Sequence, residues 1–231
     1  MKVNGGAGVI PARHERWADL LFSRYLRVIM AKDFQSVRLM GPVARLPDDI
    51  PLLIVANHGT WWDGFFVYLC NEMFLGRKLH LMMLEEQLRR FPFFRRLGAF
   101  GIRRGHPRAV AESLRYAASL LDAPGNAVCI FPQGEIKARS VRPLGFKRGI
   151  ETIVKMHDGD VTILPLAIRC ELLGWRKPVA FLLPGEPVSA GRDVFPGVPH
   201  LERCQESLLD RLDGMIASGE TGISLVGRRR A

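Results

Sequence analysis

A short apolar run followed at once by seven polar and aromatic residues constrains this chain more than any other feature of its sequence. The run, Leu52 to Ala56, is opened by Pro51 and has the length and branched apolar content of a buried strand. The next residues, Asn57 to Asp63, read Asn-His-Gly-Thr-Trp-Trp-Asp, and Gly64 to Cys70 is typical of a buried helix. A histidine and a carboxylate therefore come just past the carboxyl end of a strand, where open α/β sheets bind their ligands.

His58 and Asp63 can act as a pair if the turn between them folds back. Residues five apart do not share a face of a regular helix, but here His58 lies in the loop and Asp63 at the start of the helix. A carboxylate on one ring nitrogen fixes the tautomer of an imidazole and makes the other nitrogen a general base for a hydroxyl. The alternative is structural: Asp63 caps the helix, and the backbone holds His58 in its loop. The pair alone leaves both interpretations open.

Three further blocks follow the His58 block in order along the chain. Gly101 to Arg104 has a glycine and basic residues after a short strand, Phe131 to Glu135 reads Phe-Pro-Gln-Gly-Glu, and Ile163 to Ile168 is an apolar strand with a central proline. Together with Asn-His-x-x-x-x-Asp, these blocks resemble the four motifs of the glycerolipid acyltransferase family, whose best-known members acylate lysophosphatidic acid. The resemblance covers about residues 50 to 170.

The resemblance implies an enzyme that transfers an acyl group from a thioester, acyl-CoA or acyl carrier protein, to an alcohol. In that reaction His58 takes the proton of the acceptor hydroxyl and later protonates the thiolate, while Asp63 orients the ring. The hydroxyl attacks directly, and the chain contains no Gly-x-Ser-x-Gly nucleophile elbow. A backbone N–H in residues 59 to 61 is the hypothesis for the oxyanion donor. The thioester is a co-substrate, and no other cofactor is expected.

The third block departs from the family's usual Phe-Pro-Glu-Gly-Thr-Arg-Ser. Gln133 removes a negative charge, Glu135 adds one, and the positive charge moves to Lys137. The expected acceptor is 1-acylglycerol-3-phosphate or a related lysolipid. A carboxylate at 135 would repel a phosphate, however, so the alternative is a sugar, a glycolipid or another membrane alcohol. By resemblance, the acceptor is bound by residues of the second and third blocks: Arg103, Arg104, Gln133, Gly134, Glu135, Lys137 and Arg139.

Two aromatic-rich segments are candidates for membrane contact. From Glu15 to about Lys32, Trp17 and other apolar residues recur at three- and four-residue steps, with arginines on other faces. Such a helix can lie in a bilayer interface or pack on the domain core, and the resemblance favours lipid. The second segment places Phe91, Phe93 and Phe94 between two arginine pairs, as membrane contacts or as core. We expect membrane lipids as partners and a cytoplasmic protein that is peripheral on the inner face of the membrane.

Apolar runs that alternate with helical periods predict an α/β fold with a mostly parallel central sheet flanked by helices. An amphipathic N-terminal helical segment, residues 1–45, would precede an acyltransferase domain, residues 46–231. After the first strand, further strands are expected over 78–84, 99–102, 127–131, 161–168 and 179–183. Helices are expected over 85–90, 107–121, 149–156 and 200–216.

Charge and cysteine content restrict the partners and cofactors. The formal net charge is +10, from 33 Lys and Arg against 23 Asp and Glu, which favours anionic partners such as lipid headgroups. No nucleic-acid motif appears, and no nucleic-acid partner is expected. A non-catalytic basic module and a thioester hydrolase remain as rival functions.

The four cysteines are far apart and the histidines lack metal-ligand spacing, so neither a disulfide framework nor a metal site is predicted. No apolar run reaches the about 20 residues of a transmembrane helix.

Overall fold

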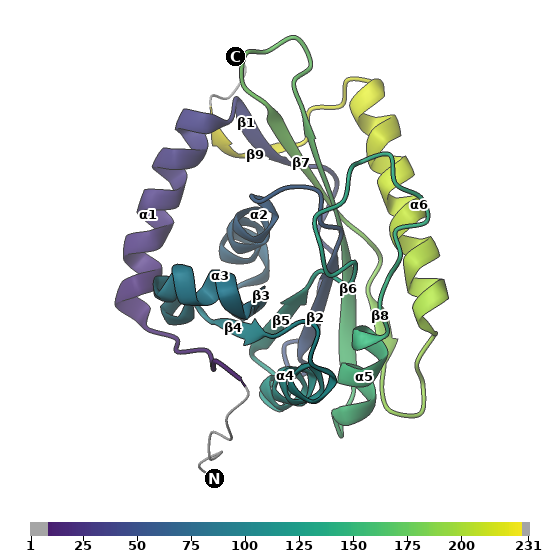
Figure 1. Cartoon of the computed structure of the whole chain (residues 1–231). Helices are drawn as coiled ribbons and strands as arrows, with labels where there is room; N and C mark the ends of the chain where they lie inside the picture. The colour runs from purple at the N-terminus through teal and green to yellow at the C-terminus, as the bar shows by residue number, and fades with distance from the viewer. Residues whose placement is uncertain (1–8, 228–231) are drawn as a thin grey trace.

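A central sheet runs through the molecule in the computed structural model, which describes residues 9–227 (Figure 1). Residues 1–8 of the expected N-terminal segment lie outside this range. Within it the sheet has nine strands: eight are neighbours in the order β4-β3-β5-β2-β6-β7-β1-β9, and β8 pairs with β6. In chain order the strands are β1 (Ser36–Leu39), β2 (Leu52–Ala56), β3 (Lys78–Leu84), β4 (Ala99–Ile102), β5 (Asn126–Ile130), β6 (Val161–Glu171), β7 (Val179–Pro184), β8 (Val188–Ala190) and β9 (Ile223–Gly227).

The half of the sheet that carries the His58 loop is parallel. β4, β3, β5, β2 and β6 run in one direction, and Leu53 of β2 pairs with Val128 of β5 on one side and Ile163 of β6 on the other. Beyond β6 the direction changes, because β7 is antiparallel to β6 and β9 is antiparallel to β1. The predicted α/β fold with a mostly parallel sheet is confirmed. In the parallel half all carboxyl ends lie at one edge, so the loops after β2, β4 and β5 face the same space.

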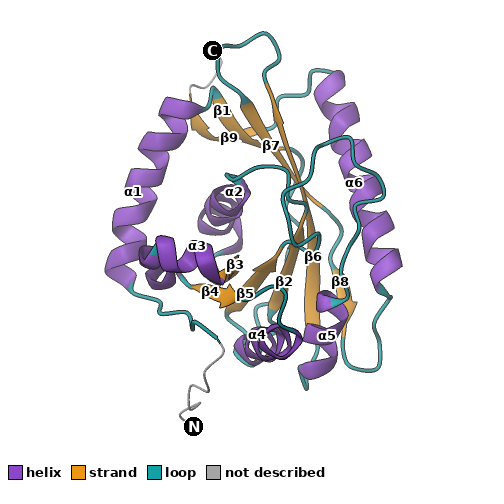
Figure 2. Cartoon of the chain, in the orientation of Figure 1, coloured by secondary structure: helices purple, strands orange, loops and turns teal. Residues whose placement is uncertain are grey.

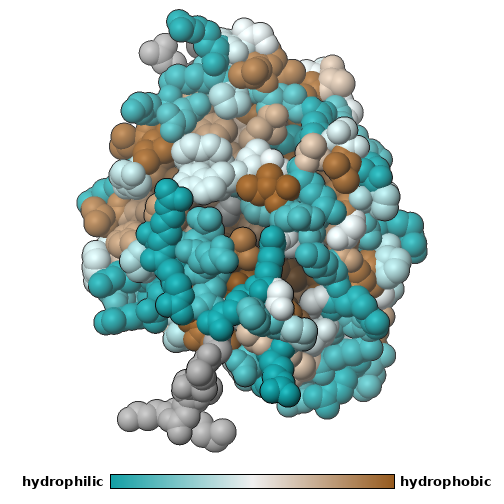
Figure 3. Space-filling view, in the orientation of Figure 1, coloured by the Kyte–Doolittle hydropathy of each residue, from teal (hydrophilic) through white to brown (hydrophobic). Residues whose placement is uncertain are grey.

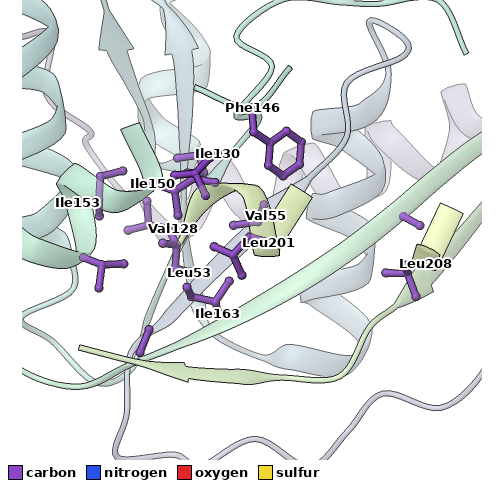
Figure 4. Packing of buried hydrophobic residues seen from close by; sticks show 14 of the residues in the cluster. Leu53, Val55, Val128, Ile130, Phe146, Ile150, Ile153, Ile163, Leu201 and Leu208 are labelled. Atoms are coloured by element: carbon purple, nitrogen blue, oxygen red, sulfur yellow. The ribbon is translucent and has the colours of Figure 1, made fainter. Parts of the chain in front are cut away.

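Helices cover both faces of the sheet (Figure 1, Figure 2). Leu53 and Val55 of β2 point into a core that α4, α5 and α6 share, and Figure 4 shows this packing. Leu52, Ile54 and Ala56 point to the opposite face, into a core shared with α1 and α2. β2 is therefore buried on both faces. The helical elements are α1 (Arg16–Asp33), α2 (Asp63–Cys70), the π-helix η1 (Asn71–Leu75), α3 (Glu85–Arg90), the 3-10 helix η2 (Pro92–Leu97), α4 (Pro107–Leu120), α5 (Gly149–Met156) and α6 (Val198–Ala217).

The first helix, α1, is apolar on two sides. Four residues spaced four apart face the core: Ala18, Phe22, Leu26 and Met30. The apolar residues that the sequence groups with Trp17 lie on a different side of the helix. Their side chains are 51 to 68% exposed at Trp17, Leu20, Leu21, Tyr25 and Val28. Figure 3 shows hydrophobic side chains along the outer edge of the molecule at α1. The helix thus packs on the domain core with one face and leaves a second apolar face exposed.

The predicted strands and helices after residue 50 are confirmed to within a few residues. The differences are at element ends: β6 continues to Glu171, and α6 begins at Val198. β1, β8 and β9 were not predicted. β1 lies within the expected 1–45 segment but pairs with β7 in the central sheet, and the boundary at residue 45 stays a prediction. In the described part of the chain, no helix combines the length and apolar character needed to cross a bilayer.

Candidate active site

Asn57 fixes the loop after β2 to the neighbouring strand. Its buried side chain donates from Nδ2 to the Ile168 carbonyl at 3.0 Å and accepts the Ile168 N–H at Oδ1 at 2.8 Å. The Gln205 amide of α6 donates to the same Oδ1 at 3.4 Å. His58, the next residue, therefore begins from a backbone position that β6 and α6 both hold.

His58 and Asp63 form the pair that the sequence predicts. Nδ1 of His58 lies 2.8 Å from Oδ2 of Asp63. Because an ionised carboxylate only accepts hydrogen bonds, Nδ1 carries the proton and Nε2 keeps its lone pair. The Asp63 side chain is 1% exposed and the His58 side chain 22%, so the carboxylate lies behind a ring that reaches solvent. Within residues 9–227, Nε2 has no hydrogen-bond partner. This is the arrangement that a general base requires.

The turn before α2 holds the Asp63 carboxylate. Oδ2 also accepts the Gly59 N–H at 2.8 Å and the Thr60 N–H at 2.9 Å, and Oδ1 accepts the Thr60 hydroxyl at 2.6 Å. These donors satisfy a buried charge that would be costly without them. The carboxylate makes no cap hydrogen bond to α2, so a helix cap does not describe it. The backbone N–H groups of residues 59 to 61 are the candidates for the oxyanion donor. Those of Gly59 and Thr60 already donate to Asp63, so the N–H of Trp61 is the remaining candidate.

The third block supports both the backbone and the ring of His58. Buried Gln133 accepts the His58 N–H through Oε1 at 2.6 Å, and the Lys137 N–H donates to the His58 carbonyl at 2.9 Å. The Phe131 ring stacks on the imidazole, with centroids 4.3 Å apart and planes at 19°. Phe131 and Thr60 were not among the predicted site residues. The signal for Phe131 was its position, directly after a strand that borders β2.

Arg103 of the second block is engaged in an ion pair. It donates two hydrogen bonds, of 2.7 and 2.8 Å, to the buried carboxylate of Glu85, and Arg89 binds the same carboxylate at 2.6 Å. Hydrogen bonds from Arg103 and then Arg89 lower the pKa of Glu85 to about 2. Arg103 therefore joins β4 to α3, and its guanidinium is already neutralised.

Arg139 is engaged as well. It pairs with Glu171 at the end of β6 and with Asp213 of α6, at 2.9 Å for the second contact. Asp213 also binds the buried Arg169 through two hydrogen bonds of 2.8 and 3.1 Å. These pairs tie the basic loop after the third block to α6.

Arg104 and Lys147 differ from these arginines. Among residues 9–227, neither side chain pairs with a carboxylate. Lys147 was not among the predicted site residues, and it packs over Gly134, whose φ is +70°. A Cβ at position 134 would lie 3.0 Å from the Lys147 Nζ, so this glycine gives the lysine room.

Two cavities meet at His58. The larger, of about 650 Å³, has mainly apolar walls and extends over the carboxyl ends of β3, β4 and β5. The smaller, of about 140 Å³, lies around the His58 loop, and most but not all of the residues that line it are polar. In Figure 3, hydrophobic side chains are visible between hydrophilic ones near the centre of the face. The predicted residues divide between the cavities: Arg104, Gly134 and Glu135 line the larger one, and Asp63, Gln133, Lys137 and Arg139 line the smaller one.

The rings predicted to contact the membrane form one cluster. Trp17 packs edge-on against Phe93, with centroids 6.3 Å apart, and Phe93 contacts Phe22 of α1 at 6.2 Å. Phe94 contacts Phe22 at 6.1 Å and Phe91 at 5.9 Å, and it lines the larger cavity. Trp17 is half-exposed and the three phenylalanines are partly buried. The phenylalanines therefore connect the exposed face of α1 to the cavity wall.

Comparisons with known proteins give a family match and a structural match. Residues 43–169 match the model of a family described as Acyltransferase. Among solved structures, the chain is similar to the crystal structure of the 1-acyl-sn-glycerophosphate (LPA) acyltransferase PlsC from Thermotoga maritima. The TM-score is 0.58 and the identity 20%, over 87% of this chain and 79% of that chain, a level at which the likeness concerns the fold. No curated protein matches the chain.

Proposed function

Because the chain belongs to the acyltransferase family, as its resemblance to the glycerolipid enzymes predicted, we propose that it transfers a fatty acyl group from a thioester to a lipid hydroxyl. Family membership makes it an enzyme that transfers acyl groups. The donor, acyl-CoA or acyl carrier protein, the acceptor and the residue roles are the finer parts of the proposal.

One observation carries the mechanism: His58 lines both cavities. The acyl chain of the donor lies in the large apolar cavity, and the acceptor hydroxyl enters from the small polar one. Nε2 of His58 takes the hydroxyl proton as the oxygen attacks the thioester carbonyl. The C–S bond then breaks, and His58 returns the proton to the thiolate. Asp63 holds the ring and stabilises the imidazolium, and the Trp61 N–H is the proposed oxyanion donor.

Release of thiol from an acyl thioester, measured with and without lipid acceptor, tests the proposal. Acceptor-dependent thiol release with an acylated lipid as product supports it. Equal release without acceptor, with free fatty acid as product, would identify a thioester hydrolase instead. His58→Ala addresses the non-catalytic alternative, because a binding module would have no turnover in either form.

The leading acceptor is 1-acylglycerol-3-phosphate or a related lysolipid, with Gln133, Lys137 and Arg139 as the residues closest to it in the polar cavity. A second candidate is a neutral hydroxyl acceptor, such as a glycolipid or another membrane alcohol. The ion pairs favour this candidate, since Arg103 and Arg139 are already neutralised by carboxylates. Mass spectrometry of the products from a mixed panel of lysophospholipids and glycolipids decides between them.

Membrane contact is proposed for the exposed apolar face of α1. Trp17 and its neighbours on that face lie beside Phe93, and the Arg96 guanidinium sits 5.2 Å from the Trp17 ring. Aromatic rings combined with basic side chains suit an anionic bilayer interface. We propose a peripheral protein on the inner, cytoplasmic leaflet, docked through α1.

Flotation with vesicles of mixed neutral and anionic lipid tests this docking. Leu20→Glu and Val28→Glu place a charge on the exposed apolar face and are expected to abolish flotation without loss of folding. Ser119→Glu adds the same charge at an exposed position of α4 and serves as the matched control. Equal flotation of all three variants would remove α1 from the proposal.

A further inference from the structure

The hairpin that joins β6 to β7 projects from the edge of the sheet that carries the active site. Ala56, the last residue of β2, pairs with Leu166, and β6 then continues for five more residues, about 16 Å at the rise of a strand. β7 returns antiparallel, so residues 172–178, here the tip, close the hairpin. Figure 1 shows this hairpin at the top of the molecule, beyond the end of α1. The tip therefore extends beyond the strand end that carries His58.

Large apolar side chains are exposed at the tip. Leu172 is 59% exposed, Leu173 53% and Trp175 42%. Two exposed cations, Arg176 and Lys177, follow them directly in the chain. Single apolar residues on a protein surface are ordinary, but a group of them with charged neighbours marks a surface that contacts a partner. The tip has this character.

The backbone of the tip does not favour leucine at position 173. The Trp175 N–H donates to the Leu172 carbonyl at 2.7 Å, which closes a four-residue turn. Both central residues of this turn have positive φ, +36° at Leu173 and +76° at Gly174. Asparagine or glycine adopts such a conformation at lower cost than a bulky apolar residue. A leucine that is both strained and exposed contributes little to folding, which points to a contact outside the chain.

Exposed apolar side chains recur along the same edge of the sheet. Trp61 follows β2 and is 52% exposed, and Ile136 follows β5 and is 51% exposed. β5, β2 and β6 are parallel neighbours, so the segments that follow them lie at one edge. Trp61 and Ile136 line the large cavity, and residues 168–170, at the base of the hairpin, line the small one. Both cavities therefore lie on the edge from which the tip projects.

The tip also adjoins the helix that is proposed to dock on the membrane. Lys177 donates from Nζ to the Ala31 carbonyl near the end of α1, at 3.3 Å. The Gln35 N–H, just after α1, donates to the Pro178 carbonyl at 2.8 Å. Val28, three residues before Ala31, is 68% exposed on the apolar face of α1. The tip therefore lies close to one end of that face.

We propose that the tip is a membrane anchor, which inserts into the interface of an anionic bilayer and holds the edge with both cavities against the lipid. The two leucines and Trp175 enter the apolar boundary, and Arg176 and Lys177 stay among the headgroups. A turn this short offers far less than the about 800 Å² per partner that a stable protein interface buries, whereas interfacial binding needs only a few apolar side chains and charge. The proposal deepens the proposed function and rests on it for one point, that the acceptor is a membrane lipid.

Vesicle binding in the absence of substrates tests the anchor directly. Leu173→Asn suits the positive φ, so its thermal unfolding midpoint should be unchanged or higher than that of the wild type. Its affinity for vesicles of mixed neutral and anionic lipid should fall about tenfold, because one leucine no longer enters the apolar phase. Unchanged vesicle affinity would overturn the proposal, and so would a lower midpoint that accounts for the loss.

A matched control comes from the opposite edge of the sheet. Val194 is 71% exposed in the loop after β8, and Ala190 at the end of β8 pairs with Val161 at the start of β6. Val194→Asn removes a similar apolar side chain far from the tip and should leave the vesicle affinity unchanged. An equal loss in Val194→Asn and Leu173→Asn would show that the tip has no special role and would refute the anchor.

Arg176→Gln separates the contribution of charge from that of apolar insertion. The affinity of this variant should fall about fivefold on anionic vesicles, because one cation near the headgroups is lost, and should not change on neutral vesicles. Leu173→Asn should weaken binding to both kinds of vesicle. An equal effect of Arg176→Gln on both kinds, or none on anionic vesicles, would refute the contact between the tip and the headgroups.

Turnover distinguishes failure of the anchor from failure of the proposed function. The rate with acceptor in vesicles, divided by the rate with a short-chain soluble acceptor, should fall about tenfold in Leu173→Asn and stay constant in Val194→Asn. A wild-type protein that binds vesicles through the tip but transfers no acyl group would refute the proposed function and leave the anchor standing. If Leu173→Asn keeps its vesicle affinity and instead raises the KM for acyl carrier protein, the tip binds a protein and the anchor is refuted.

Discussion

The chain contains two His-x-x-x-x-Asp pairs, and they fold into different environments. His14 and Asp19 have the same spacing as His58 and Asp63, and in both pairs Nδ1 faces Oδ2, at 3.2 and 2.8 Å. Asp19 is 32% exposed, whereas Asp63 is 1% exposed. Spacing thus brings the two groups together in each case, and the surroundings decide what the pair can do.

The second ring nitrogen makes the functional difference. Nε2 of His14 donates to the Leu79 carbonyl at 2.8 Å, so both of its ring nitrogens face acceptors. Nε2 of His58 faces the cavities with its lone pair available. The first pair also lies at the start of α1, and the second follows the carboxyl end of a central parallel strand. A base needs the open nitrogen as well as the carboxylate.

The largest expected difference between the two pairs is in kcat after each histidine is replaced by alanine. His58→Ala is expected to lower kcat about a thousandfold, within the range for loss of a general base. His14→Ala is expected to leave turnover per folded molecule near the wild-type value. Initial rates at saturating donor and acceptor measure both. A large loss in His14→Ala with an unchanged thermal unfolding midpoint would show that the two pairs are not functionally distinct.

The carboxylates sharpen the same contrast. Asp63→Asn replaces an acceptor of four hydrogen bonds by a group with two N–H donors, so the tautomer of His58 is no longer fixed. We expect kcat to fall about a hundredfold or more, with little change in the KM for the donor. Asp19→Asn is the matched control and should change neither parameter. Similar losses in both variants would contradict the role given to burial of Asp63.

The sequence predicts the His58 site because its determinants are local. A strand, a turn and a helix start within about a dozen residues bring His58 to Asp63, and the order of the blocks places Phe131 to Lys137 at the neighbouring strand end. The parallel half of the sheet follows from the same alternation of strands and helices. The predictions of the fold and of the contact between His58 and Asp63 therefore needed no knowledge of distant contacts.

Local sequence could not predict which cations form ion pairs or which side of α1 faces the core. Arg103 and Arg139 were grouped with Arg104, yet their carboxylate partners, Glu85 and Asp213, lie 18 and 74 residues away in sequence. Which arginine remains unpaired depends on those tertiary contacts. In α1 two apolar stripes have the same helical period, so periodicity could not tell which one faces the core.

A third histidine extends the comparison to stability. His80 is buried beside His14, with ring centroids 5.3 Å apart. Burial, followed by the positive charges of His14 and Lys78, lowers the pKa of His80 to about 4. The unfolded chain therefore binds a proton at higher pH than the folded chain. Stability should fall as the pH falls from about 6.5 to about 4, by up to about 3 kcal/mol, and then level off for this group.

Urea unfolding at a series of pH values measures that slope. His80→Leu removes the group and should flatten the dependence in this window. His106 is exposed, so His106→Gln is the control and should leave the slope unchanged. A slope that persists in His80→Leu would assign it to other groups, and burial of His80 would then have no part in acid sensitivity.

The smallest expected effect on the rate comes from the hydrogen bond between the His58 N–H and Gln133. Removing it tests how much the backbone position of His58 contributes to kcat. Gln133 accepts the His58 N–H, and Gln133→Leu leaves that buried donor without a partner. The loss of such a hydrogen bond corresponds to about a tenfold fall in kcat if the loop shifts the imidazole away from the thioester carbonyl. Gln133→Glu restores an acceptor of the same shape and should recover most of the rate. If Gln133 instead binds only the acceptor, the change would appear in the acceptor KM, and kcat would be preserved. The split between kcat and KM therefore separates a residue that positions the base from one that binds the substrate.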